Sequence, residues 1–174
     1  MRLNKEFYTK RAFEVAPALL GKILCRKMID ANDETIILRY RITETECYFG
    51  EDDTACHAHK GKTERTKVMY EEGGVAYVYL CYGIHSLLNV VTGTLGFPEA
   101  VLIRGVENFG GPGRLTKAMG ITLSHNGEDL IHSDELWIED DGFKAEYVTD
   151  KRVGIDYATE PYKNIEWRYI SKNI

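Results

Sequence analysis

Residues 35–48 constrain the fold more than any other part of the chain, because polar and apolar side chains alternate along them. A period of two places successive side chains on opposite faces of a β-strand. One face is predicted to carry Leu38, Tyr40, Ile42, Glu44, Glu46 and Tyr48, and the other Ile37, Arg39, Arg41, Thr43, Thr45 and Cys47. We therefore expect one long strand whose carboxylates share a face with aromatic and aliphatic side chains.

Shorter strands and a few helices are predicted around this long strand. Strands are expected at residues 23–28, 75–82, 86–92, 99–106, 135–139 and 145–149, with extended chain near 152–157 and 166–170. Helices are expected at 10–20, at 64–72 and from Pro112 through Met119. The Gly83-Ile84 corner predicts a hairpin between two of the strands. The pattern favours a mixed α/β (α+β) fold with a largely antiparallel sheet, formed by one domain over residues 1–174.

Targeting signals and membrane spans are not predicted. The first residues lack the apolar core and cleavage site of a signal peptide, and no apolar run approaches about 18 residues. The four cysteines form no CxxC pair, so we expect reduced thiols in a cytoplasmic protein that is not secreted. A net charge of −5 argues against a nucleic-acid binder, although Lys60, Lys62, Arg65 and Lys67 cluster within residues 57–67.

Carboxylates and aromatic residues supply the first candidates for chemistry. Glu44 and Glu46 share a predicted strand face with Tyr48, and buried carboxylates are usually paired or functional. The alternative is an edge strand whose acids face water.

Tyr77 and Tyr79 fall on one face of the predicted hairpin, and Tyr82 at its turn could act as a wedge between stacked bases. An ordinary hairpin with a core aromatic stripe is the alternative.

Three further segments have a weaker signal. Cys56, His57 and His59 could contribute to a metal site, with the two histidines pointing the same way on an extended chain, but their spacing matches no standard zinc pattern. Arg104 ends an apolar strand, where it could reach solvent or hold an anion. The glycine-rich turn at 110–113 precedes a helix with Arg114 and Lys117, and helix N-termini can bind phosphate.

Taken in order along the chain, these motifs resemble the alkyladenine (3-methyladenine) DNA glycosylase family. The resemblance is carried by ALLGK at 18–22, TETECY at 43–48, DDTACH at 52–57, GKTER at 61–65, YVYLCYGIH at 77–85, NV at 89–90, VLIR at 101–104, GPGRL at 111–115 and RVGI at 152–155. It implies a curved antiparallel sheet with flanking helices and a protruding β-hairpin. It also implies an enzyme that flips a damaged purine out of duplex DNA and hydrolyses its N-glycosidic bond.

The resemblance implies a role for each candidate residue. Tyr82 would intercalate from the minor groove, and Asn89 would disfavour the amino group of normal guanine. Tyr48, His57 and Tyr79 would line the base pocket, where aromatic faces attract a cationic alkylated purine. Glu46 would act as general base on a water held with help from Arg104. The candidates for contact with the DNA backbone are Lys62, Arg65, Arg114 and Lys117.

The implied enzyme initiates base excision repair on double-stranded DNA containing damaged purines, of the 3-methyladenine, 7-methylguanine or hypoxanthine type. It would be monofunctional, because no lysine occupies a position suited to a Schiff base. No cofactor, metal or membrane is expected, and the protein would be a monomer, associated with the nucleoid if bacterial. The connection from Val106 to Gly110 is shorter than is usual in the family and lacks a basic segment. Together with the net charge, this predicts weaker, salt-sensitive DNA binding.

Three other functions stay open at this point. The first is a non-catalytic relative that binds nucleic acid or a base without turnover. The second is a metal-dependent hydrolase that uses Cys56, His57 and His59. The third is a nucleoside hydrolase, which would need no wedge at Tyr82.

Overall fold

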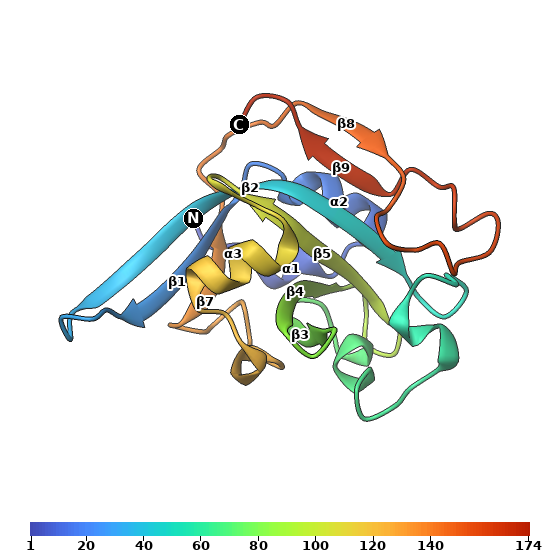
Figure 1. Cartoon of the computed structure of the whole chain (residues 1–174), viewed down its shortest axis with the longest axis horizontal. Coiled ribbons are helices and arrows are strands. Elements are labelled where there is room, and N and C mark those ends of the chain that lie inside the picture. The colour runs from blue at the N-terminus through green and yellow to red at the C-terminus, as the bar shows by residue number, and fades with distance from the viewer.

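The long strand predicted from the alternating pattern is the central element of the sheet. A computed structural model describes all residues, 1–174, and places β2 (Thr35–Phe49) between β1 (Ile23–Ile29) and β5 (Glu99–Val106). The sheet runs β3-β4-β5-β2-β1-β7, with β3 (Ala76–Cys81), β4 (His85–Thr92) and β7 (Leu136–Glu139). The remaining strands are β6 (Phe109–Gly110), β8 (Tyr147–Asp150) and β9 (Arg168–Ser171). Every strand pair is antiparallel, which confirms the predicted fold class (Figure 1).

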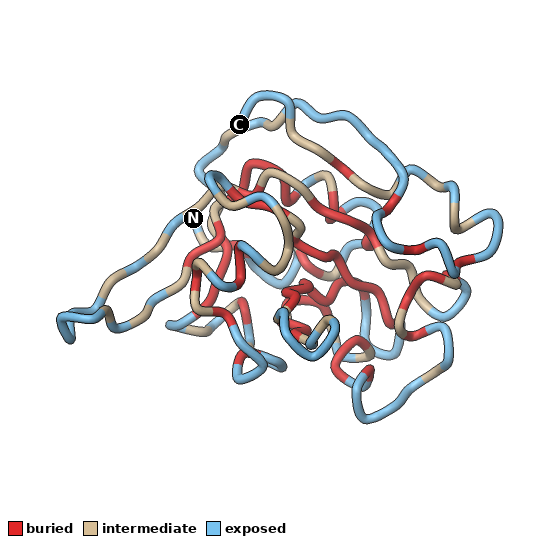
Figure 2. Tube along the Cα trace, viewed as in Figure 1, coloured by how far each residue is buried: buried red, intermediate tan, exposed pale blue.

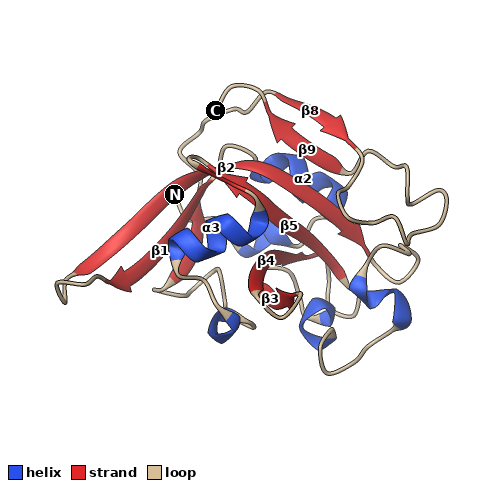
Figure 3. Cartoon of the chain, in the orientation of Figure 1, coloured by secondary structure: helices blue, strands red, loops and turns tan.

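Three short α-helices lie against this sheet (Figure 3). They are α1 (Lys5–Tyr8), α2 (Ala12–Leu19) and α3 (Pro112–Met119). Helix α2 packs on β2 and β5, and α3 packs on β4 and β5. Pro112 stands at the first position of α3, and Gly120 ends the helix in a left-handed conformation, as such termini favour. None of the helices has the length and apolar character that crossing a bilayer requires.

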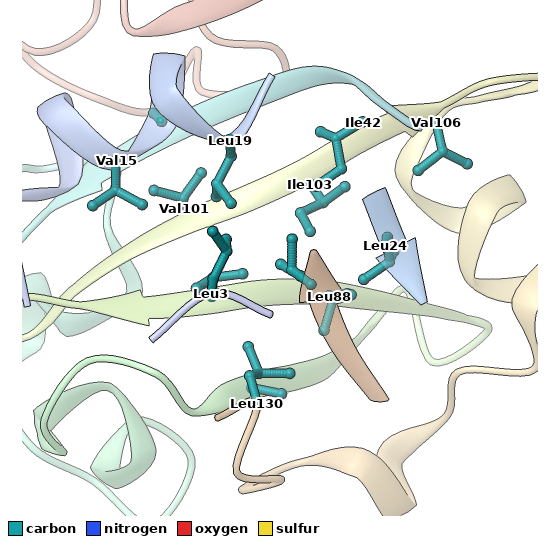
Figure 4. Packing of buried hydrophobic residues seen from close by; sticks show 14 of the residues in the cluster. Leu3, Val15, Leu19, Leu24, Ile42, Leu88, Val101, Ile103, Val106 and Leu130 are labelled. Carbon is teal, nitrogen blue, oxygen red and sulfur yellow. The ribbon is translucent and has the colours of Figure 1, made fainter. Parts of the chain in front are cut away.

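The main hydrophobic core packs residues of the sheet with residues of all three α-helices. Leu19, Leu24, Ile42, Leu88 and Ile103 are fully buried there and come from a helix and four different strands (Figure 4). By contrast, the far end of the β1–β2 ribbon projects from the body and is largely exposed (Figure 2). The buried elements therefore hold the middle of β2 and of β5 in a fixed geometry.

A bulge interrupts the alternation predicted for β2. The register against β5 shifts between Ile42 and Thr45, so a strict two-residue period does not continue through the strand. Ile42 packs into the same hydrophobic core as Cys47, although the sequence pattern predicts these two side chains on opposite faces. Bulges re-aim side chains, and this one lies next to both Glu44 and Glu46.

Three local predictions differ from the structure. Residues 64–72 contain only a 3₁₀ turn, Lys67–Tyr70, in place of the expected helix. Residues 57–60 also form a 3₁₀ turn, whereas extended chain was expected around His57 and His59. Residues 152–157 form bends and turns and no strand. Arg152 in this segment binds Asp53, and the Val153 N–H binds Glu46 of β2.

The β5–β6 connection is as short as the sequence predicts. Val106 pairs with Phe109 and Gly105 with Gly110, so Glu107 and Asn108 form the turn. Asn108 has φ of 68°, a left-handed conformation that asparagine tolerates better than most residues. The chain reaches α3 directly after this hairpin.

Gly73 ties the N-terminal helix to the sheet through a close backbone contact. A Cβ at this position would lie 2.2 Å from the carbonyl oxygen of Tyr8. We expect Gly73→Ala to lower the free energy of unfolding by about 1–3 kcal/mol, since the backbone of Tyr8 would have to move. Urea unfolding checks this, with Gly110→Ala as control, because a Cβ at Gly110 meets nothing within 4 Å. Equal stability of the two variants would contradict the expectation.

Candidate active site

A cavity of about 640 Å³ opens between the β3–β4 hairpin, β5, the start of α3 and residues 153–157. This volume is within the range of small-ligand sites. Of the candidate residues named from the sequence, those that line it are Tyr48, Cys56, His57, Arg65, Tyr77, Tyr79, Tyr82, Asn89 and Arg104. The fold therefore brings together side chains that span residues 48–104 of the sequence.

Glu46 lies beneath this cavity and is completely buried. Its Oε1 accepts a hydrogen bond from the Tyr48 hydroxyl at 3.0 Å, and its Oε2 accepts one from the Val153 backbone N–H at 2.6 Å. Arg104 Nη1 lies 3.5 Å from Oε1. Glu46 is not itself a lining residue, but its partners Tyr48, Arg104 and Val153 are, so the carboxylate lies directly behind the cavity wall.

Burial raises the pKa of the Glu46 carboxyl above the ordinary glutamate value. The positive charge of Arg104 opposes this rise most strongly, followed by the hydrogen bonds from Val153 and Tyr48. A buried carboxylate with a raised pKa, next to an arginine in a cavity, is typical of a general base.

A buried ion pair fixes the segment that carries Val153. Arg152 and Asp53 are both fully enclosed, and their two hydrogen bonds measure 2.6 and 2.9 Å. Arg152 also donates to the Cys47 carbonyl at 3.1 Å and lies 5.0 Å from the centre of the Tyr48 ring. Asp53 in turn accepts from the backbone of Phe49 and Ala55, at 3.0 Å each. This pair links the C-terminal chain to the end of β2.

Aromatic rings form one wall of the cavity. The His57 and Tyr79 rings meet edge to face with centroids 4.5 Å apart, and Tyr77 lies 5.4 Å from Tyr79. His57 Nδ1 is 3.1 Å from the Tyr77 hydroxyl. Burial, with a smaller contribution from Arg65, lowers the pKa of His57 to about 4, so the ring is neutral at neutral pH. Asn89 is nearly buried and donates to the Tyr77 carbonyl at 3.2 Å.

The rim of the cavity carries Tyr82 at the tip of the β3–β4 hairpin. Its side chain is 91% exposed, the highest value among the large hydrophobic residues after Met1. Tyr82 and Gly83 have φ of 53° and 66°, and Ile84 N–H donates to the Cys81 carbonyl at 3.1 Å. Left-handed backbone is uncommon for a bulky residue such as tyrosine, so this turn holds the ring outward at some conformational cost.

The four basic candidates are not equivalent. Arg65 lies at the cavity, with its guanidinium carbon 5.2 Å from the centre of the Tyr79 ring. Lys62 stacks over Tyr70 at 5.6 Å, outside the cavity lining. Arg114 and Lys117 are exposed on α3, whose first residues, Pro112 and Gly113, border the cavity.

The two histidines considered for a metal site contact different partners. His57 Nδ1 lies against Tyr77, whereas His59 is exposed with its Nδ1 2.7 Å from the Glu51 carbonyl oxygen. The 3₁₀ turn rotates the two side chains apart, which corrects the expectation of a common direction. No group of three or more histidine, cysteine or acidic side chains in the chain is arranged to hold a metal ion.

The types of residue in the sequence do not by themselves identify several groups at the site. The backbone N–H of Val153 has no side-chain signature, and the Asp53–Arg152 pair spans nearly a hundred residues of sequence. Tyr157 borders the cavity and donates to the Ala55 carbonyl at 2.9 Å. The only signal was that residues 52–57 and 152–155 stand among the motifs of the family resemblance.

We expect Arg152→Met to lower the free energy of unfolding by about 3–5 kcal/mol, because it leaves the Asp53 carboxylate buried without a counter-charge. Urea unfolding at pH 7 measures the change. The matched control is Lys67→Met, which breaks a solvent-exposed pair with Glu64 and should change stability little. A loss for Arg152→Met no larger than the control's would refute the anchoring role.

Known proteins resemble this chain over nearly all of its length. A model of the methylpurine-DNA glycosylase (MPG) family matches residues 6–110 and 107–174, and the two matches overlap over the short β5–β6 turn and β6. Three relatives share the name "Putative 3-methyladenine DNA glycosylase". The relative from Rickettsia felis is 44% identical over 99% of this chain and 94% of its own.

The other two relatives agree with this result. The protein from Psychrobacter cryohalolentis is 43% identical over 97% of this chain and 91% of its own length, and the one from Clostridium novyi is 42% identical over 99% and 96%. Identities and coverage of this size show common descent and a common fold. The chain belongs to the methylpurine-DNA glycosylase family.

Proposed function

We propose that this protein is a DNA-3-methyladenine glycosylase that starts base excision repair by hydrolysing the N-glycosidic bond of a flipped, damaged purine. The observation that carries the proposal is the enclosed Glu46 carboxylate, held with Arg104 directly under an aromatic cavity. Family membership and the names of the relatives support the same reaction.

In the proposed reaction, Glu46 removes a proton from a water molecule. A carboxylate offers about four lone-pair sites, and the bonds from Tyr48 and Val153 occupy two of them, so it can still accept one from water. The water oxygen bonds to the sugar C1′ while the bond from C1′ to the purine nitrogen breaks, and the purine leaves with the electron pair. The positive charge that develops on the sugar is stabilised by the nearby carboxylate.

The cavity wall suits a cationic alkylated purine. Electron-rich faces of Tyr48 and Tyr79 would attract the positive ring. His57 is neutral at neutral pH, so it adds no repelling charge. Asn89 is held by its hydrogen bond to Tyr77, which supports a fixed steric role against the amino group of guanine. The same wall accepts neutral purines such as hypoxanthine by stacking.

Two features support recognition of duplex DNA followed by base release without strand cleavage. Tyr82 projects beside the cavity, where it could fill the space left by the flipped nucleotide. No lysine lines the cavity, so a Schiff base with the opened sugar is not available, and an intact abasic site is the product. Lys62, Arg65, Arg114 and Lys117 are the proposed backbone contacts. We propose that the enzyme acts as a monomer, as one domain, inside the cell.

We expect Glu46→Gln to lower the single-turnover rate of base release by at least about a hundredfold, because the amide cannot accept the proton. The assay follows release of 3-methyladenine, 7-methylguanine or hypoxanthine from duplex DNA, with alkali added afterwards to cut abasic sites. The control is Glu71→Gln, an exposed glutamate outside the cavity. Full activity of Glu46→Gln would disprove the assignment.

For the unmodified protein, activity should fall with acid at a pH above the ordinary glutamate pKa, since the base works only when deprotonated.

Tyr82→Ala should weaken activity on duplex DNA by about tenfold or more, since the extruded nucleotide would no longer be replaced in the stack. Activity on a single-stranded substrate should fall much less, because no neighbouring pair has to be opened. The control is Leu95→Ala, another exposed apolar residue that does not line the cavity. Full activity of Tyr82→Ala on duplex DNA would contradict the wedge role and would favour the nucleoside hydrolase alternative, which needs no wedge.

A further inference from the structure

Glu44 is the acidic residue of the 43–48 motif to which the proposed reaction assigns no role. It lies in the β2 bulge, paired across the sheet with Gly105 of β5 on one side and Ile170 of β9 on the other. Its Oε1 accepts a hydrogen bond from Arg104 Nε at 3.2 Å. The same oxygen is 3.6 Å from Arg168 Nε.

Two carboxylates therefore hold the Arg104 guanidinium at two different edges. Glu44 binds the Nε edge, and Glu46 lies 3.5 Å from Nη1. An unrestrained arginine side chain has many rotamers, and a hydrogen bond at Nε selects among them by fixing the plane of the guanidinium. Arg104 is itself one of the residues that line the cavity.

The surrounding residues keep Glu44 in place for this contact. Position 105 is glycine, and a Cβ there would lie 2.8 Å from Thr43 Oγ1 and 3.6 Å from the Glu44 Cβ. Arg168 approaches Glu44 from β9 and is itself held by Asp150 of β8 at 3.2 Å. A Cβ at 105 would press on the Thr43 hydroxyl, whereas its distance to the Glu44 Cβ is an ordinary contact.

We propose that Glu44 is a positioning residue for the glycosylase reaction, which holds Arg104 by its Nε so that the guanidinium stays beside Glu46 and the attacking water. This inference rests on the proposed function, in which Glu46 is the general base. Glu44 itself touches neither the base nor the water, and acts only through Arg104. The arrangement explains why an acidic residue is present at both 44 and 46.

The pH dependence of activity distinguishes a positioning role of Glu44, through Arg104, from a direct effect of its negative charge on Glu46. The charged and titratable groups around Glu46 are Tyr48 of β2, Arg104 of β5, Arg168 of β9, and Arg152 and Tyr157 of the C-terminal segment. Arg104 lowers the pKa of Glu46. If loss of Glu44 frees Arg104 to move away, the acidic limb of activity shifts to higher pH. If loss of Glu44 only removes a nearby negative charge, the limb shifts to lower pH.

The experiment compares Glu44→Ala with Glu44→Gln, whose amide oxygen can still accept from Arg104 Nε. Single-turnover base release from a lesion-bearing duplex is measured between pH 4.5 and 8, together with the Kd for that duplex. We expect Glu44→Ala to lower the rate about tenfold to a hundredfold, with Kd within about threefold and an acidic limb at higher pH. Glu44→Gln should stay within about threefold of the unmodified rate.

A double-mutant cycle with Arg104→Met tests whether Glu44 acts through Arg104. Adding Glu44→Ala to Arg104→Met should produce no further loss, because the side chain to be positioned is already absent. The proposal would be overturned if the rate losses of Glu44→Ala and Arg104→Met multiply in the double variant. It would also be overturned if Glu44→Ala and Glu44→Gln lose equal activity, or if the Glu44→Ala rate is unchanged. Failure of the proposed function is detected separately, by full activity of Glu46→Gln.

Discussion

The enclosed pair of Asp53 and Arg152 is the interaction on which the site depends. It joins the loop after β2 to a C-terminal segment that has no regular secondary structure of its own. Arg152 reaches the Cys47 carbonyl and covers Tyr48, while the next residue donates its N–H to Glu46. This ion pair thus orders one wall of the cavity and fixes the residue whose backbone N–H donates to the proposed base. Each member of the pair needs the other, since a buried charge without a partner would be strongly unfavourable.

The sequence predicts the strands well wherever a two-residue period coincides with β-branched and aromatic residues. The strands at 23–29, 99–106 and 136–139 and the helix at 112–119 lie within two residues of their expected bounds. The bulge in β2 was not predicted, because it depends on pairing with two other strands and leaves no local signature. The segment at 152–157 looks extended in its residue types, but the backbone N–H of Val153 donates to the Glu46 carboxylate, which is far away in the sequence.

The candidate site, like the fold, is only partly predictable from the sequence. Composition and alternation indicate that Glu44, Glu46 and Tyr48 belong together, but the family resemblance was needed to connect them with Tyr82, Asn89 and Arg104. Physical reasoning from residue types could not choose between a solvent-facing acid and a buried one at position 46, because the choice depends on what covers the strand. The covering residues come from the other end of the chain, and their arrangement follows from long-range contacts.

The hairpin tip restricts what the protein can become by mutation. Tyr82 has a positive φ, which glycine, asparagine and aspartate adopt readily and β-branched residues adopt only with strain. A replacement that fits this backbone would be too small to fill a gap in stacked bases, and a β-branched wedge of useful size would distort the turn. A relaxed backbone and a side chain of useful size are therefore two separate physical demands at this position, and neither small nor β-branched residues meet both.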